Sequence, residues 1–176
     1  MVFEVGQAEG TLNMDENDLT EADWRHVRRC VELAQEALEA GDEPFGSVLV
    51  AEDGTALQED RNRVADGDRT RHPEFALARW AVEHLTPDQR ARTTVFTSGE
   101  HCPMCSAAHG WVGLGRIVYV HSSAQLAAWL EELGVAPPPV ATLPISRVVP
   151  HVPVLGPIAG LDQQVRELHR RHHAPS

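Results

Sequence analysis

The sequence contains no lysine, so all 15 of its Lys and Arg residues are arginine. Without lysine, no side chain can form a Schiff base, hold pyridoxal phosphate as an internal aldimine, or act as the lysine of a phosphate-binding loop. A genome that favours arginine codons would explain the absence. The classes of chemistry that need a lysine are excluded whatever the cause of its absence.

Long apolar runs are also missing. No stretch approaches the ~20 apolar residues that a membrane-spanning helix needs. Residues 1–18 are acidic and have no basic region before an apolar core, so they do not resemble a secretory signal. We therefore expect a cytoplasmic protein without a membrane partner, which begins with an acidic arm at residues 1–18.

Basic residues are outnumbered, since 15 Lys and Arg stand against 26 Asp and Glu and give a formal net charge of -11. A protein that grips phosphate backbones needs basic residues to displace counterions. The charge therefore favours a small-molecule substrate over a nucleic acid, and a local arginine patch is the arrangement that could still bind a polyanion.

Cysteine is scarce, with only Cys30, Cys102 and Cys105. An odd count in a chain that we expect in the cytoplasm does not indicate a disulfide framework. Cys102 and Cys105 form a C-x-x-C pair, which is typical of a metal site or a redox site. Cys30 lies on the apolar side of an expected helix, and we interpret it as a core residue.

The 176 residues are enough for one domain with a sizeable core, which we place at 19–176 after the arm. Apolar spacing, capping residues and Gly or Pro breaks locate the elements. Helices are expected from Thr20 to Gly41, from Pro73 to about residue 85, from Pro103, and at 124–133 and 161–173; strands are expected in a hairpin at 47–62 and at 93–98, 116–121 and 145–149. This order predicts a three-layer α/β/α sandwich with a mixed sheet.

Two short motifs carry the chemistry: His72-Pro73-Glu74 and Cys102-Pro103-Met104-Cys105. The C-x-x-C pair alone would also fit a redox protein. Each motif begins a predicted helix, and a helix–strand–helix unit would bring the two helix starts side by side. His72, Cys102 and Cys105 then converge, and three protein ligands with one open position are typical of a catalytic zinc.

Glu74 lies on the same helical turn as His72 but should point elsewhere, so it can face the metal site without being a ligand. A carboxylate in that place can move protons between water and a substrate. The alternative is an acid that only caps the helix. His101 is the nearest candidate for a fourth ligand, but adjacent residues rarely both reach one metal.

These motifs resemble the cytidine deaminase superfamily, whose signature is H-x-E followed by P-C-x-x-C. With PFGSVLV, Asn62 and TSGEHCPMCSAA, residues 20–120 most resemble the branch of guanine, cytosine and tRNA adenosine deaminases. The resemblance implies a five-stranded sheet, zinc as cofactor and a homodimer, in which the proline-stiffened linker at 137–139 could carry the last helix onto a neighbour. Pro73 stands where most members have Ala, and His101 where most have Pro.

The resemblance also implies substrate contacts. Asn62 matches an amide that contacts the base, and the alternative is a loop residue that ends a strand. Phe45 could stack on the ring or belong to the core. His101 could shape substrate choice at the mouth of the pocket or face solvent. A second catalytic acid of guanine-deaminase-like members corresponds to Glu131 or Glu132, which could equally form a solvated helix face.

The leading hypothesis is a zinc-dependent hydrolytic deaminase that releases ammonia from a free nucleobase or base-like ring: guanine, cytosine or an aminotriazine. Adenosine deamination in tRNA is the rival activity, which the acidic charge disfavours. An inactive zinc-bound binding or structural module would not need Glu74, and a redox protein would not need His72-Pro73-Glu74. The run HRRHH at 169–173 resembles a metal-binding tract, but we expect an exposed, frayed end.

Overall fold

The computed structural model describes residues 15–174, so most of the predicted acidic arm lies outside the described residues. Its last part, Glu16–Asp18, forms a short 3-10 helix, η1, capped by Asp15. Glu16 Oε1 accepts a hydrogen bond from the Ala159 N–H at 2.9 Å, which ties this end of the arm to the rest of the fold. None of the helices within 15–174 is long and apolar enough to cross a membrane.

A five-stranded mixed sheet forms the middle layer, with strand order β2-β1-β3-β4-β5. β1 is antiparallel to β2 and β3, whereas β3, β4 and β5 run parallel. The strands are β1 Gly46–Val50, β2 Ala56–Arg61, β3 Thr94–Gly99, β4 Arg116–His121 and β5 Val154–Leu155. The mixed five-stranded sheet expected from the sequence is confirmed.

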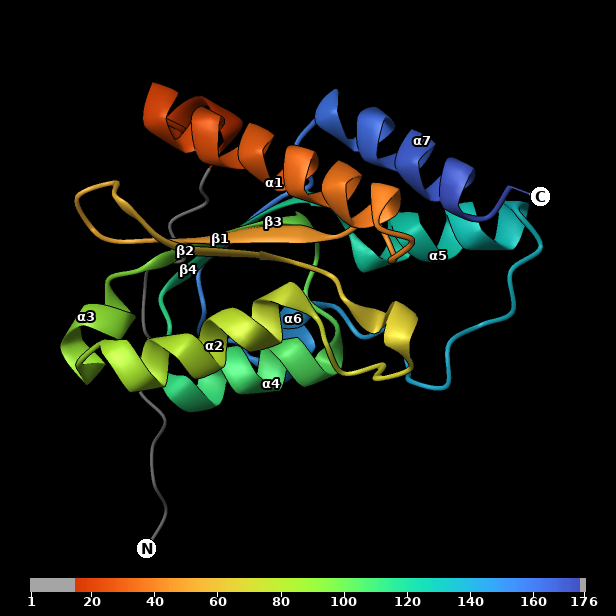
Figure 1. The fold of residues 1–176 in the computed structure, drawn as a ribbon. Coiled ribbons are helices and arrows are strands. Elements are labelled where there is room, and N and C mark those ends of the chain that lie inside the picture. Colours follow the sequence, from red (N-terminus) through yellow and green to blue (C-terminus); the bar gives the residue numbers. More distant parts are fainter. Residues whose placement is uncertain (1–14, 175–176) are drawn as a thin grey trace, which may run out of the picture.

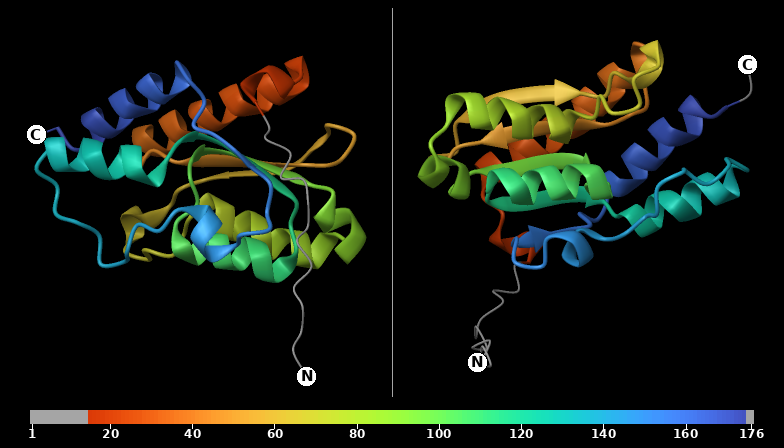
Figure 2. Two further views of the ribbon diagram at one scale, coloured as in Figure 1. Left: turned by 180° about the vertical axis from the view of Figure 1, so that it is seen from behind. Right: turned by 90° about the horizontal axis from the view of Figure 1, so that it is seen from below.

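Helices cover both faces of the sheet, which confirms the three-layer α/β/α sandwich (Figure 1; Figure 2 shows the layers from behind and from below). One face carries α1 Glu21–Glu39, α5 Ser123–Glu132 and α7 Leu161–His172; the other carries α2 Pro73–His84, α3 Pro87–Ala91, α4 Pro103–Val112 and α6 Ile145–Val148. A second short 3-10 helix, η2 Val64–Asp66, lies between β2 and α2.

The start of α1 follows from its sequence. Thr20 Oγ1 accepts from the Asp23 N–H at 3.1 Å, and the Asp23 carboxylate accepts from the Thr20 N–H at 2.9 Å, so the predicted capping box is present. Such reciprocal bonds satisfy two N–H groups that the helix itself cannot pair. Cys30 on this helix is 0% exposed and belongs to the core, as expected.

The sheet separates two apolar cores, because successive strand residues point to opposite faces. Val48 and Phe96 pack in the core under α1, whereas Leu49 and Val95 pack against α2. By the same alternation, Ser47 and the other odd-numbered residues of β1 and β3 face α2. Since α2 begins with one of the two chemical motifs, polar residues at these positions can reach it.

Two expectations about the C-terminal third were wrong. Residues 145–149 begin a short helix, α6, and the fifth strand is the two-residue β5 at Val154–Leu155. Helix α7 packs against α1 and α5. His169, predicted to lie on a frayed end, is 2% exposed because its ring packs against Phe45 and His121.

Candidate active site

One edge of the sheet gathers the candidate functional residues. Phe45 precedes β1 and Asn62 follows β2, and the Asn62 N–H donates to the Phe45 carbonyl at 3.0 Å. Glu100 follows β3 and His121 ends β4, and the Glu100 N–H donates to the His121 carbonyl at 2.8 Å. This edge contains the C-terminal ends of the parallel strands, where α/β folds generally bind ligands.

Three possible metal ligands converge at this edge. His72 Nδ1 lies 3.5 Å from Cys102 Sγ and 3.6 Å from Cys105 Sγ, and the three donor atoms all lie within 4.8 Å of one another. Zinc–nitrogen bonds of ~2.0–2.1 Å and zinc–sulfur bonds of ~2.3 Å place a nitrogen and a sulfur about 3.6 Å apart at tetrahedral angles. One imidazole and two thiols at these distances fit zinc, which confirms the predicted ligand cluster.

Proline fixes the backbone at both motifs. Pro73 and Pro103 occupy the first turns of α2 and α4, where a missing N–H removes no helical hydrogen bond. The preceding residues, His72 and Cys102, are extended, as residues before proline usually are. Both ligands are therefore held at helix N-termini. Pro73 is compatible with the start of α2, although most members of the family that the motifs resemble have Ala at this position.

The electrostatics of the cluster favour a thiolate at Cys102. A hydrogen bond with Cys105, aided by one with His72, lowers the pKa of Cys102 to about 4. The hydrogen bond with Cys102 in turn raises the pKa of His72. The thiolate is the form of cysteine that binds metals, and the N-terminus of α4 stabilises its negative charge.

Glu74 is 6% exposed and faces the sheet. Its Oε1 lies 3.0 Å from Ser47 Oγ and 2.8 Å from Thr97 Oγ1, and the two hydroxyl oxygens are 2.9 Å apart. Burial raises the pKa of Glu74. The carboxylate lies beside the ligands, since it is one of the groups that raise the pKa of Cys105, after the hydrogen bond with Cys102 and burial.

Three polar residues at this edge of the sheet were not identified as candidate functional residues from the sequence. Ser47 and Thr97 face each other across β1 and β3, and both reach Glu74. Glu100 accepts from the Ser123 N–H at 2.7 Å and from the Ile145 N–H at 2.8 Å, so it joins the starts of α5 and α6. Hydroxyl residues inside apolar strands, and an acid just before the C-x-x-C pair, were the signals that could have identified them.

Two of the predicted substrate contacts lie at the same edge as the ligands. Asn62 is 1% exposed, and its Oδ1 accepts from the Val64 N–H at 3.0 Å. Within residues 15–174, its amide nitrogen donates no hydrogen bond. Phe45 is half-buried, with its ring 5.0 Å from that of His169. Asn62 is thus fixed by one end of its amide, and Phe45 packs as part of an aromatic cluster.

The other residues predicted to bind the substrate or to act as a second acid are His101, Glu131 and Glu132. His101 is 1% exposed and its ring packs edge-on against His109 at 5.3 Å, which excludes the alternative of a solvent-facing side chain. Glu131 and Glu132 are exposed at the far end of α5, and Glu132 pairs with Arg166 of α7. The structure does not bring either glutamate to the ligand cluster.

Comparison with known protein families gives a match over residues 20–121 to the model of the cytidine and deoxycytidylate deaminase zinc-binding region. A probable cytosine deaminase of Schizosaccharomyces pombe is 34% identical over 127 residues, which cover 71% of this chain and 76% of that protein. A guanine deaminase of Bacillus subtilis is 37% identical over 95 residues, 53% of this chain and 60% of that protein. A tRNA-specific adenosine deaminase of Agrobacterium fabrum is 33% identical over 87 residues, which cover 49% of this chain and 57% of that protein.

Among solved structures, a guanine deaminase from Nitrosomonas europaea superposes with a TM-score of 0.63. The superposition covers 88% of this chain and 85% of that protein, at 21% sequence identity. At this identity the likeness shows the fold alone. It agrees with the five-stranded sheet and flanking helices described above.

Proposed function

This chain belongs to the cytidine and deoxycytidylate deaminase zinc-binding family, and we propose that it deaminates a free nucleobase or base-like ring such as cytosine, guanine or an aminotriazine. The observation that carries the proposal is the placement of Glu74 beside the donor atoms of His72, Cys102 and Cys105. A zinc site that serves only structure, or a redox pair, has no use for a buried carboxylate in that place.

The reaction requires a nucleophile and a proton carrier. His72, Cys102 and Cys105 would hold the zinc, which would supply a Lewis acid that activates water at neutral pH. Glu74 takes a proton from the attacking water and gives it to the ring nitrogen next to the amino-bearing carbon. It then passes the second proton to the leaving amine, so that the carbon–nitrogen bond breaks and ammonia departs.

Ser47 and Thr97 act through Glu74. Both hydroxyls lie within hydrogen-bond distance of Oε1, which leaves Oε2 for proton transfer. Because both hydroxyls come from paired positions of the sheet, they fix the direction of the carboxylate. Hydrogen bonds to a charged acceptor are stronger than neutral ones, so the pair can hold this geometry against the preference of the side chain for other rotamers.

Asn62 and Phe45 serve the substrate in this proposal. The Asn62 amide nitrogen, which is left over after Oδ1 binds the Val64 N–H, donates to an acceptor of the ring. Phe45 borders the face of the ring. Glu131 and Glu132 take no part, since both are exposed.

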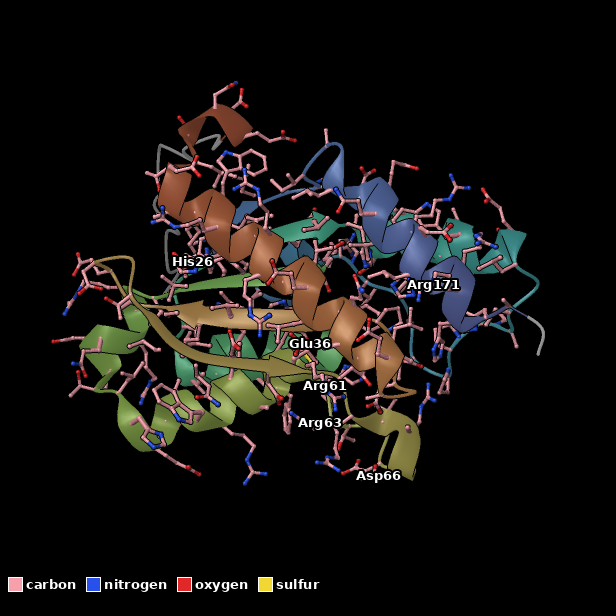
Figure 3. All side chains as sticks on the ribbon, turned by 45° about the horizontal axis from the view of Figure 1, so that its top comes forward. His26, Glu36, Arg61, Arg63, Asp66 and Arg171 are labelled. Carbon is pink, nitrogen blue, oxygen red and sulfur yellow. The ribbon has the colours of Figure 1, made fainter. Side chains whose placement is uncertain are left out.

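A free ring fits the charge distribution better than tRNA. The chain carries a net charge of -11, and the arginines around the loop that holds Asn62 and His72 are locally balanced by acids. Figure 3 shows Arg61, Arg63 and Asp66 at this place. The pairs are Arg61 with Asp42, Arg63 with Asp60, Arg69 with Glu43 and Arg71 with Asp66. Such paired arginines offer little net charge to a phosphate backbone.

The proposal is tested by ammonia release from cytosine, guanine, adenine, their nucleosides and aminotriazines, beside inosine formation in tRNA. We expect turnover of at least one free ring and none of tRNA. Strong inosine formation with silent free bases would favour the tRNA adenosine activity instead, which the relative from Agrobacterium fabrum makes the rival candidate.

The hydroxyl pair gives a separate prediction. The double variant Ser47→Ala with Thr97→Val should lower kcat by ~10- to 100-fold, because an interaction with a charged group is lost at the reacting carboxylate. KM should change little, since neither hydroxyl is assigned a contact with the substrate. Steady-state ammonia release measures both constants.

Ser98→Ala is the matched control for that variant. Ser98 is a buried hydroxyl next to Thr97, but it lies on the other face of β3 and accepts from the Gly46 N–H at 3.1 Å. We expect its kcat to stay within about twofold of the unmodified protein. Equal losses in Ser98→Ala and in the double variant would show that the hydroxyls only support the fold.

We also propose a homodimer, which the family resemblance implies. The adjacent helices α2 and α4 expose apolar side chains on the outside of the molecule: Val82 is 51% exposed and Trp111 88%. Burial of these side chains against a second copy would remove apolar area from water. Light scattering at micromolar concentration should give the dimer mass for the unmodified protein and the monomer mass for Trp111→Glu. A monomer mass for the unmodified protein would contradict the proposal.

A further inference from the structure

His121 is a buried imidazole with one unused nitrogen. It ends β4 at the sheet edge that also carries the ligand cluster, and it is 1% exposed. Its Nδ1 lies 3.2 Å from the Ser122 carbonyl oxygen, and since a carbonyl can only accept, Nδ1 carries the ring proton. Burial lowers the pKa of His121 to about 4, so the ring is neutral and Nε2 is a bare acceptor. This atom has no hydrogen-bond partner among the described residues.

Gly99 makes the space for this ring. A β-carbon at position 99 would lie 2.7 Å from His121 Nε2 and 3.0 Å from Phe45 Cε1, so no other residue fits there without a shift of these rings. Residue 99 is the last residue of β3, and a side chain there would point at the rings of His121 and Phe45. The imidazole therefore takes the place that a side chain of residue 99 would occupy.

Thr97 connects the end of β3 to the reacting carboxylate. Its Oγ1 lies 3.0 Å from the Gly99 carbonyl oxygen and 2.8 Å from Glu74 Oε1. Cys102 follows three residues after Gly99. His121 thus lies next to the end of β3, between Thr97, which contacts Glu74, and the loop that holds Cys102.

Other rings surround His121 and fix its orientation. The ring centroids of Phe45, Trp129 and His169 lie 6.0, 5.1 and 5.4 Å from that of His121. They come from the segment before β1, from α5 and from α7, so the last helix of the chain closes over the imidazole. A ring packed from several sides cannot turn its nitrogen toward another partner in the fold.

A buried polar atom without a partner is rare in folded proteins and usually has a functional explanation. His101, His109 and His169 also have unpartnered nitrogens; the rings of His101 and His109 pack on each other, and His169 belongs to the rings around His121. His121 differs because it ends β4 next to Gly99, at the sheet edge that carries the ligand cluster, and because its tautomer is fixed.

We propose that His121 is a specificity-determining residue whose Nε2 accepts a hydrogen bond from a ring N–H of the substrate. This inference rests on the proposed function and narrows its substrate class. Glu74 serves the amino-bearing carbon, and His121 binds a second edge of the same ring. The preferred substrate carries an unsubstituted ring N–H at that edge, as free cytosine and free guanine do. A base that carries a sugar or a methyl group on that nitrogen has no such donor.

The test combines variants of the protein with variants of the substrate. Cytosine and guanine are compared with analogues that carry a methyl group at each ring N–H in turn, in the unmodified protein, His121→Phe and His121→Gln. The unmodified protein should prefer the free base over one methylated analogue by ~10- to 100-fold in kcat/KM, the loss expected for one buried hydrogen bond. His121→Phe should lose activity on the free base, so that this preference collapses. His121→Gln, which offers an amide oxygen, should recover part of it.

His26→Phe is the matched control. His26 lies on α1 (Figure 3). Its Nε2 is 2.9 Å from the carbonyl oxygen of Gly54 in the β1–β2 turn, and its ring packs on Phe96. This variant also removes one partly buried imidazole, but far from the sheet edge, and it should keep the full preference for the free base.

The possible outcomes separate the role of His121 from the proposed deaminase function. An unchanged preference in His121→Phe, or no recovery in His121→Gln, overturns the role of His121 and leaves the proposed function intact. Equal activity of the unmodified protein on all methylated analogues also overturns it, even if His121→Phe does not fold. Absence of ammonia from every free base overturns the proposed function, and this inference with it.

Discussion

Glu74→Gln is expected to keep the fold and the zinc and to lose most of its turnover, by ~10²–10⁴-fold or more. Glutamine has nearly the same shape, and its amide oxygen can still accept from Ser47 and Thr97, which hold Oε1 in the unmodified protein. An amide cannot take up and release the protons that the reaction moves. The loss should therefore fall on kcat in an ammonia-release assay, while zinc content by elemental analysis stays the same.

Glu83→Gln is the matched control for this prediction. Glu83 lies on the same helix, α2, but is exposed, so removal of its charge should leave turnover nearly unchanged. Near-normal turnover of Glu74→Gln on a substrate of the unmodified protein would remove Glu74 from the mechanism.

The second large effect is expected from the metal ligands. Cys102→Ser replaces a thiolate with a hydroxyl, which is a far poorer ligand for zinc at neutral pH. Zinc content should fall from about one per chain to well below that, since a catalytic zinc has only three protein ligands. Turnover should fall with it. Elemental analysis and ammonia release on the same preparation measure the two losses together.

Cys30→Ala separates metal binding from a general effect of removing a cysteine. Cys30 is 0% exposed in the core under α1 and lies outside the group of donor atoms. This variant should lose some stability through the smaller side chain and keep its zinc. Full zinc content and turnover in Cys102→Ser would contradict the ligand assignment.

The sequence was most informative where a local rule leaves few choices. The capping box at Thr20 and Asp23 located the start of α1, and the proline within each motif located the starts of α2 and α4. The His72 and Cys102 motifs could be paired because a helix–strand–helix unit brings its two helix starts to the same sheet edge. The metal cluster was therefore predictable from spacing, and the family resemblance agreed with it.

The C-terminal third was less predictable because its elements depend on distant partners. β5 has only two residues and exists because β4 offers an edge at Ile117 and Val118. α6 starts where Glu100, 45 positions earlier, accepts from the Ile145 N–H. No local pattern at 145–149 reveals such a partner, and an apolar run there is equally compatible with a strand.

The surroundings of the site were hidden for a similar reason. The rings around His121 come from segments far apart in the sequence, and the space that admits them is a missing side chain at Gly99. His169 looked like part of a polar, frayed end, whereas packing on Phe45 and His121 buries it. Periodicity locates a helix but does not show which of its polar residues will be covered by the rest of the fold.

Ammonia release measured at increasing zinc occupancy tests the central claim most directly. The protein is stripped with a chelator, reloaded in steps, and assayed on the free ring that the substrate panel identifies. We expect the rate to rise in proportion to bound zinc and to level off at about one zinc per chain. Glu74→Gln loaded to the same level should stay near the background rate. Full turnover by metal-free protein, or no ammonia from any aminated ring by zinc-loaded protein, would contradict the assignment of this chain as an active zinc-dependent deaminase of free rings.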